Sequence, residues 1–174
     1  MPHRQQLLIA FIGPVGSGKT HVARIIAQKL KAVHIRTDDI RVALRREGKS
    51  YSSAPALANR MRREALAQGK SVVSDSDAVL PRRQKELGAL AEKFGARLAV
   101  IKLRTPEKLI LKRLKDHVYT KDDLFKNAAE ATRVYFIRKK MHERIGQNHP
   151  DFVINNAQPL APQINRIMKK LAGL

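Results

Sequence analysis

Residues 13–20 carry the clearest chemical signal in the sequence, because they follow the phosphate-binding pattern GxxxxGK[ST]. Glycines let backbone N–H groups turn inward around an anion, and a following helix directs its positive end at the same anion. Lys19 is predicted to reach the β- and γ-phosphates of a nucleotide, and the Thr20 hydroxyl is predicted to ligate Mg²⁺. The residues predicted to bind the nucleotide are Gly13, Pro14, Val15, Gly16, Ser17, Gly18, Lys19 and Thr20.

A carboxylate and a guanidinium three residues apart, Asp38 and Arg41, form a second candidate group. Positions i and i+3 share one face of a helix, so these two side chains are expected to lie together. Asp38 is predicted to accept a proton from an attacking hydroxyl, and Arg41 to hold an anionic acceptor. The structural alternative is that Asp38, or Thr37 before it, caps the helix while Arg41 is solvated.

Three further positions complete the candidate chemistry. Asp75 ends an apolar run, and a carboxylate in that place can hold Mg²⁺ directly or through water. Ser76 and Asp77 are instead expected to cap the helix that starts at Pro81. Arg113 is predicted to stabilise the charge of a phosphoryl group in transfer. The alternative for Arg113 is a solvated arginine on a basic helix.

The spacing of apolar residues predicts the strands and helices that position these candidate residues. The unbroken apolar run Leu7–Ile12 is typical of a strand buried on both faces of a parallel sheet. The other predicted strands are 32–35, 71–75, 98–103 and 151–154. Helices are predicted at 20–31, 39–46, 56–68, 81–94, 106–115 and 162–171, with a basic helix that follows the aperiodic segment 116–123 and ends near residue 145.

This alternation of strands and helices predicts one α/β domain, residues 1–174, with a five-stranded and mostly parallel sheet between two helical layers. Ligands of such sheets bind at the carboxyl ends of the strands. All three polar groups follow strands, so they are expected to converge there.

Composition excludes several classes of protein. The 174 residues include no cysteine, which excludes disulfide scaffolds, thiolate zinc sites and cysteine nucleophiles. No apolar stretch reaches 18 residues and no secretory signal is evident, so a cytoplasmic protein is expected. The net charge of +20 indicates either a polyanionic partner such as nucleic acid or simply a basic, soluble surface. Much of this excess lies in 41–71 and 100–150.

The combination of motifs resembles the small P-loop kinases that include the kinase domain of phage-type polynucleotide kinase and the zeta-toxin kinases. The matching stretches are GPVGSGKT, DDIR at 38–41, and KSVVSDSD followed by PRRQKELGALAEKFG. The resemblance implies a three-layer α/β/α fold with a helical lid at residues 113–140, ATP as phosphoryl donor and Mg²⁺ as cofactor. It also implies that Asp38 is the general base and Arg41 an acceptor-phosphate contact.

The chain departs from these kinases in its lid. Such kinases carry a second lid arginine about one turn after the first, but Lys115 and His117 stand there in this chain, which leaves Arg133 or Arg138 as substitutes. Residues 155–160 resemble the loop beside the adenine in related kinases, and the aperiodic segment 116–123 is predicted to be a hinge.

Three functions remain open from the sequence. The first is a kinase acting on a nucleic-acid 5′-hydroxyl, favoured by DDIR and the positive charge; the second is the same chemistry on a small metabolite or nucleotide sugar. The third is a module that binds nucleic acid in a nucleotide-dependent way. An AAA-type motor is disfavoured because the chain lacks room for a helical second domain, and a GTPase because no Asn-Lys-x-Asp sequence occurs.

Overall fold

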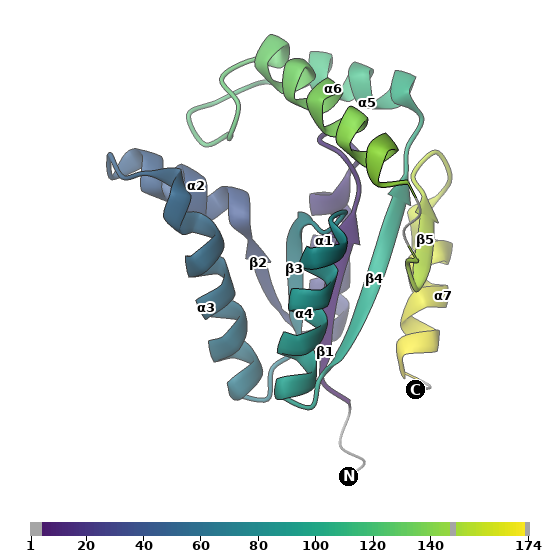
Figure 1. Ribbon diagram of the computed structural model, residues 1–174. Helices are drawn as coiled ribbons and strands as arrows, with labels where there is room; N and C mark the ends of the chain where they lie inside the picture. The colour runs from purple at the N-terminus through teal and green to yellow at the C-terminus, as the bar shows by residue number, and fades with distance from the viewer. Residues whose placement is uncertain (1–4, 147–148, 173–174) are drawn as a thin grey trace.

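Five parallel strands form a single sheet in the order β2-β3-β1-β4-β5 in the computed structural model, which describes residues 5–146 and 149–172. The strands are β1 (Leu7–Ile12), β2 (Val33–Arg36), β3 (Val72–Asp77), β4 (Arg97–Arg104) and β5 (Phe152–Asn155). The helices are α1 (Lys19–Leu30), α2 (Thr37–Arg46), the short 3₁₀ helix η1 (Tyr51–Ser53), α3 (Ala54–Ala67), α4 (Pro81–Lys93), α5 (Glu107–Asp116), α6 (Ala128–Ile145) and α7 (Leu160–Ala172) (Figure 1).

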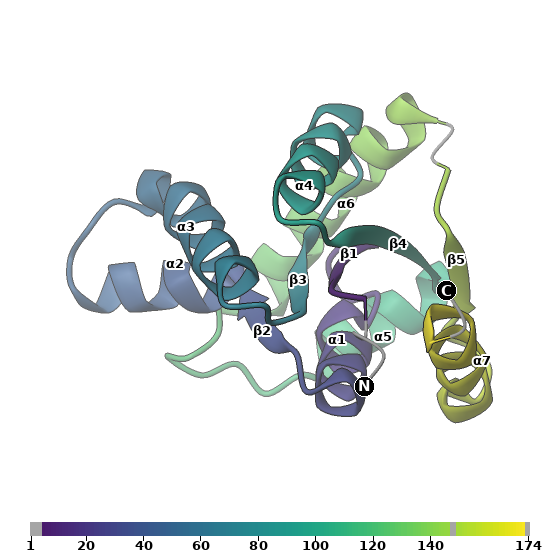
Figure 2. The ribbon, with the colours of Figure 1, turned by 90° about the horizontal axis from the view of Figure 1, so that it is seen from below.

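The central strand β1 explains the two helical layers. Its residues are all buried, and alternate side chains point to opposite faces of the sheet. Leu7, Ile9 and Phe11 pack with the apolar residues of α1 and α7. On the other face, Leu8 and Ala10 pack with those of α3 and α4. Figure 2 shows these two pairs of helices on opposite sides of the sheet, as expected for a strand that is apolar throughout.

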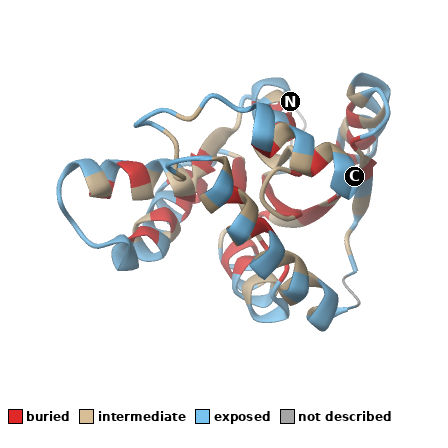
Figure 3. Cartoon of the chain, turned by 90° about the horizontal axis from the view of Figure 1, so that it is seen from above, coloured by how far each residue is buried: buried red, intermediate tan, exposed pale blue. Residues whose placement is uncertain are grey.

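Helices α5 and α6 lie across the carboxyl ends of the strands (Figure 1). A small apolar cluster joins them, and its members are Ile110, Leu114, Ala131 and Tyr135, with Val15 of the glycine loop packed against it. Residues 113–140, predicted as a lid, therefore run from the end of α5 through most of α6. Figure 3 shows that the connection between the two helices is largely exposed.

The pairing of β1 with β3 is irregular where the candidate residues lie. Ala10 pairs with Ser74, but the next residue of β1, Phe11, pairs with Asp77. Asp75 and Ser76 are thus extra residues opposite a continuous stretch of β1. Bulges of this kind change the direction of side chains at the end of a strand, and they are common beside functional sites.

The predicted α/β fold is confirmed, with corrections at element ends. The proposed cap at Thr37 or Asp38 is wrong, because α2 already begins at Thr37, after Arg36, and no side chain caps it. Ser76 and Asp77 do not cap α4 either, since Leu80 holds that position without a side-chain hydrogen bond and β3 extends through Asp77. Across residues 5–146 and 149–172, no helix combines the length and apolarity needed to cross a membrane.

Candidate active site

The glycine loop connects the buried end of β1 to the first residue of α1, Lys19. Gly16 and Gly18 have φ values of 77° and 91°, a region that L side chains rarely adopt. At Gly18 a Cβ atom would also collide with the Asn156 side chain and lie 3.2 Å from Nη1 of Arg113. Glycine is therefore required at this turn for both conformational and steric reasons.

Lys19 folds back over the loop that precedes it. Its Nζ donates hydrogen bonds to the carbonyl oxygens of Gly13, at 2.5 Å, and Pro14, at 2.9 Å. Burial lowers the pKa of Lys19, and carboxylates nearby offset part of this effect: those of Asp77, Asp75 and Asp38. The ammonium group thus lies against the loop predicted to bind phosphate, within the field of Asp38, Asp75 and Asp77.

Thr20 and Asp75 form the candidate metal site. Asp75 is only 5% exposed, and its Oδ2 lies 3.4 Å from Nε2 of His34 and 3.8 Å from Nε of Arg36. Burial raises the pKa of Asp75, but hydrogen bonds from His34 and Thr20, together with the charge of Lys19, outweigh it and hold the pKa below its usual value.

These donors fit Mg²⁺. A hydroxyl and an ionised carboxylate supply the hard oxygen ligands that this ion prefers, and Oδ2 of Asp75 is a buried acceptor whose contacts with His34, at 3.4 Å, and Arg36, at 3.8 Å, are long. The described part of the chain holds no group of three or more acidic or histidine residues able to bind a metal. Such a sparse set suits Mg²⁺, which completes its shell with water and substrate phosphates.

Asp38 and Arg41 lie together in the first turns of α2, as their spacing predicts. Nη1 of Arg41 donates to Oδ1 of Asp38 at 2.6 Å, and the two side chains are 38% and 30% exposed. They are accessible, and they share the carboxyl edge of the sheet with Lys19 and Asp75. In this structure, however, the proposed base and the proposed acceptor contact neutralise each other.

Asp77 has a role that its sequence position did not reveal. Its Oδ1 accepts a hydrogen bond from the N–H of Gly13 at 3.3 Å, and its Oδ2 pairs with Nε2 of His142 at 2.6 Å. One carboxylate therefore links the start of the glycine loop to α6. His142 is 65 residues away in the chain, and no local pattern could have indicated this pair.

Of the three arginines considered for charge stabilisation, Arg113, Arg133 and Arg138, two approach the loop. Nη1 of Arg113 is buried beside Gly18 with no hydrogen-bond partner in the described residues. The charge of Arg138 acts on Lys19, which places it near the same loop, whereas Arg133 is exposed. His117, where a second lid arginine was expected, pairs with Asp123 at 2.8 Å.

Two residues that follow other strands form hydrogen bonds to the glycine loop at Ser17. Thr105 Oγ1 donates to the carbonyl oxygen of Ser17 at 2.9 Å, and Nδ2 of Asn156 donates to the same oxygen at 2.5 Å. Asn156 belongs to the segment 155–160, whose proximity to an adenine stays a prediction. What is observed is that this segment supports the loop.

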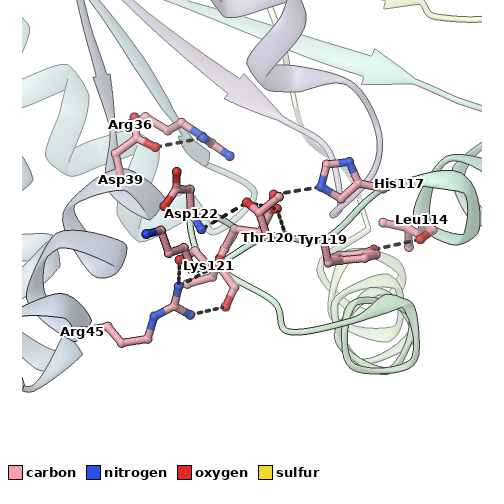
Figure 4. Close-up of polar contacts among 11 residues, drawn as sticks. Arg36, Asp39, Arg45, Leu114, His117, Tyr119, Thr120, Lys121 and Asp122 are labelled. Atoms are coloured by element: carbon pink, nitrogen blue, oxygen red, sulfur yellow. Dashed lines mark hydrogen bonds and ion pairs between the residues drawn. The ribbon is translucent and has the colours of Figure 1, made fainter.

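The connection between α5 and α6 is attached to α2 (Figure 4). Arg45 donates to the carbonyl oxygens of Lys121, at 2.7 Å, Asp123, at 2.8 Å, and Leu124, at 3.3 Å. Arg46 pairs with Asp122 on the same loop. The segment predicted as a hinge, 116–123, thus lies against the helix that carries Asp38 and Arg41.

The site has a glycine loop between a buried parallel strand and a helix, a lysine over that loop, and a threonine beside a buried aspartate. This combination defines a P-loop nucleotide-binding protein. Residues 8–138 match the protein family described as the AAA domain, and the chain belongs to that family. The described residues form one five-stranded parallel sheet with helices on both of its faces.

Solved structures show that the chain has the fold of P-loop kinases. An APS kinase of Mycobacterium tuberculosis, in complex with AMPPNP and APS, is 16% identical with a TM-score of 0.62, covering 96% of this chain and 98% of its own. A gluconokinase of Sinorhizobium meliloti is 18% identical with a TM-score of 0.60 and coverages of 99% and 94%.

A shikimate kinase of Acinetobacter baumannii, in complex with shikimate, is 18% identical with a TM-score of 0.55 and coverages of 98% and 95%. None of the curated proteins matches the sequence. The particular resemblance to polynucleotide kinase and zeta-toxin kinases is not confirmed by these comparisons, whereas the kinase fold is.

Proposed function

We propose that this protein is an ATP-dependent phosphotransferase that moves the γ-phosphoryl group of ATP to a hydroxyl group of a small metabolite. One observation carries the proposal. Two groups of residues lie together at the carboxyl edge of the sheet: Lys19, Thr20 and Asp75, which are proposed to bind phosphate and metal, and Asp38 and Arg41, which are proposed to bind the acceptor. The charge of Asp38 acts on Lys19.

The choice of acceptor follows from the structural neighbours. Their names refer to gluconate, shikimate and APS, all of which are small molecules. These names favour a metabolite over the nucleic-acid 5′-hydroxyl, which was the first expectation from the sequence. The charge of +20 remains the argument for a polyanionic acceptor, so an oligonucleotide belongs in the assay. The cytoplasmic location stays a prediction.

The loop N–H groups and Lys19 hold the β- and γ-phosphates, and Thr20 and Asp75 hold the metal. Bound Mg²⁺ neutralises charge on the phosphate oxygens. Arg113 and Arg138 approach the loop from α5 and α6, where a cation stabilises the transferring group.

Proton transfer is assigned to Asp38. Arg41 releases the Asp38 carboxylate when it turns to an acceptor anion, and Asp38 then accepts the proton of the attacking hydroxyl. The acceptor O–H bond breaks as its oxygen bonds to the γ-phosphorus, and the bond from that phosphorus to the bridging oxygen breaks, so ADP leaves.

The test is transfer of labelled phosphate from ATP to a panel of sugar acids, hydroxy acids, sugars and a 5′-hydroxyl oligonucleotide. Lys19→Ala and Asp38→Ala are each expected to lower the rate by about 100-fold or more. Asp39→Ala is the matched control, because Asp39 is the next residue, is 65% exposed and pairs with Arg36. Its activity is expected to be unchanged.

The outcomes separate the three functions. Transfer to the oligonucleotide alone, with an affinity that falls steeply with salt, would restore the first expectation from the sequence. No transfer to any acceptor, with ATP-dependent binding of the oligonucleotide, would favour the nucleic-acid-binding module. Equal losses in Asp38→Ala and Asp39→Ala would remove Asp38 from the chemistry.

A further inference from the structure

Arg62 of α3 is a fully buried arginine, with 0% of its surface exposed. It occupies an apolar phase of the helix, because Ala58 and Ala65, four residues before and three after it, pack into the core against the sheet. Lysine and arginine are almost never fully buried unless they are paired. A guanidinium in this position therefore requires an explanation.

The contacts of Arg62 do not neutralise it. Its Nε donates to the Ser74 hydroxyl at 2.9 Å, but Nη1 and Nη2 have no hydrogen-bond partner within residues 5–146 and 149–172, and no carboxylate of those residues forms an ion pair with it. Burial, together with the charge of Arg83, lowers the pKa of Arg62 to about 10. Two cationic groups thus stand near each other, and no described residue is a counter-ion for Arg62.

The direction of α3 turns Arg62 toward the carboxyl edge of the sheet. Helix α3 ends shortly before β3 begins, so its N-terminus lies at the carboxyl edge of the sheet, and side chains of a helix lean toward its N-terminus. Arg83 stands in the first turn of α4, just beyond the carboxyl end of β3. Nearer that edge in β3, Ser76 has a buried hydroxyl without a partner in the described chain.

Resting on the function proposed above, we propose that Arg62 is a specificity-determining residue that binds an oxyanion of the acceptor, so that the phosphorylated metabolite carries a carboxylate, phosphate or sulfate group. The oxyanion enters from the carboxyl edge and accepts hydrogen bonds from Nη1 and Nη2, which are arranged for two parallel bonds. Arg41 lies nearer the surface and faces the reacting end of the same acceptor.

The first test uses sulfate as the probe and thermal unfolding as the readout, with the glycine loop saturated by Mg²⁺ and AMPPNP. Sulfate is expected to raise the melting temperature of the wild type. In Arg62→Met its apparent affinity falls roughly 10- to 100-fold, and Arg62→Lys retains part of the response. Arg60→Met is the matched control, because Arg60 lies on the same helix, is 71% exposed and pairs with Glu64.

A sulfate response in Arg62→Met equal to that of the wild type overturns the inference. So does an Arg62→Met protein that, without added anion, melts well below the wild type, because that result assigns Arg62 a structural contact within the chain. Replacing an uncompensated buried charge by an apolar side chain of similar volume is instead expected to leave the melting temperature equal or higher. Acetate, titrated in parallel, distinguishes a carboxylate site from one for tetrahedral anions.

The phosphate-transfer assay tests the anion site at Arg62 separately from the proposed kinase function. For an anionic acceptor found in the panel, Arg62→Met is expected to raise KM roughly 10- to 100-fold with little change in kcat. Transfer to neutral acceptors that does not depend on Arg62 overturns the inference and leaves the kinase function standing. An Arg62-dependent sulfate response without transfer to any acceptor leaves the anion site standing and overturns the kinase function.

Discussion

Replacing Gly18 by alanine tests the geometry of the glycine loop. The backbone at Gly18 has a φ of 91°, so an L residue there costs about 1–2 kcal/mol in conformational strain. The new Cβ also displaces the Asn156 amide, which donates to the carbonyl oxygen of Ser17, and loss of that hydrogen bond costs about 1 kcal/mol. The free energy of unfolding is therefore expected to fall by about 2–3 kcal/mol.

Gly69→Ala is the control for strain alone. Gly69 has a φ of 73°, and a Cβ added there meets no atom within 4 Å. Its expected loss is about 1–2 kcal/mol by urea unfolding, and its affinity for ATP, measured by calorimetry, is expected to be unchanged. Gly18→Ala is expected to bind ATP at least about tenfold more weakly, because its loop N–H groups no longer surround the phosphates. If the two variants bind ATP equally well, the assigned phosphate site is wrong.

Three other contacts have measurable consequences. The pKa of Asp75 lies below its ordinary value of 3.8, so its ionised form contributes stability above that pH, and the contribution is lost as pH falls through the folded-state value. When the pH is lowered from 5 to 3, the free energy of unfolding measured with urea is therefore expected to fall more in the wild type than in Asp75→Asn. A double-mutant cycle of Asp77→Asn and His142→Ala is expected to give a coupling of about 1–2 kcal/mol at neutral pH, because both side chains are 16% exposed. Arg45→Ala removes three hydrogen bonds to the loop 117–127, so tryptic cleavage at the lysines of that loop is expected to accelerate severalfold.

Each of these results has a clear opposite. Parallel pH profiles of the wild type and Asp75→Asn would mean that the ionised carboxylate is not stabilised by its neighbours. Additive losses in the cycle would show that Asp77 and His142 act independently. Unchanged cleavage in Arg45→Ala would show that the loop is held by other contacts, with Arg60→Ala as the control for removing an arginine.

Local patterns predicted the parts of the site whose residues are close in the chain. Residues 13–20 form a contiguous loop, and the apolar run before it and the amphipathic helix after it specify its position, so the structure differs there only in starting α1 at Lys19. Asp38 and Arg41 meet because their spacing of three matches the helical repeat. The direction of each strand followed from the helices between strands, and the parallel sheet was correctly predicted.

Contacts between distant segments were decided by the tertiary structure. The pair of Asp77 and His142 and the support of Ser17 by Asn156 join residues 65 and 139 positions apart, and they depend on strand order and on where α6 crosses the sheet. Periodicity specifies the buried face of an element but not its partner, so no pattern in the chain could assign these contacts.

Arg62 shows the difference most clearly. Arg62 lies within the predicted helix 56–68, four residues after Ala58, but a charge at such a position is ordinarily explained by a side chain that reaches solvent. Only the packing of α3 against β3 buries the guanidinium, and none of residues 5–146 and 149–172 supplies a counter-ion. The sequence by itself thus determined the glycine loop that is predicted to bind phosphate, because the conformation of this loop depends on residues close in the chain. The environment of the acceptor side was decided by tertiary packing, because burial and the absence of a counter-ion depend on every element around a residue.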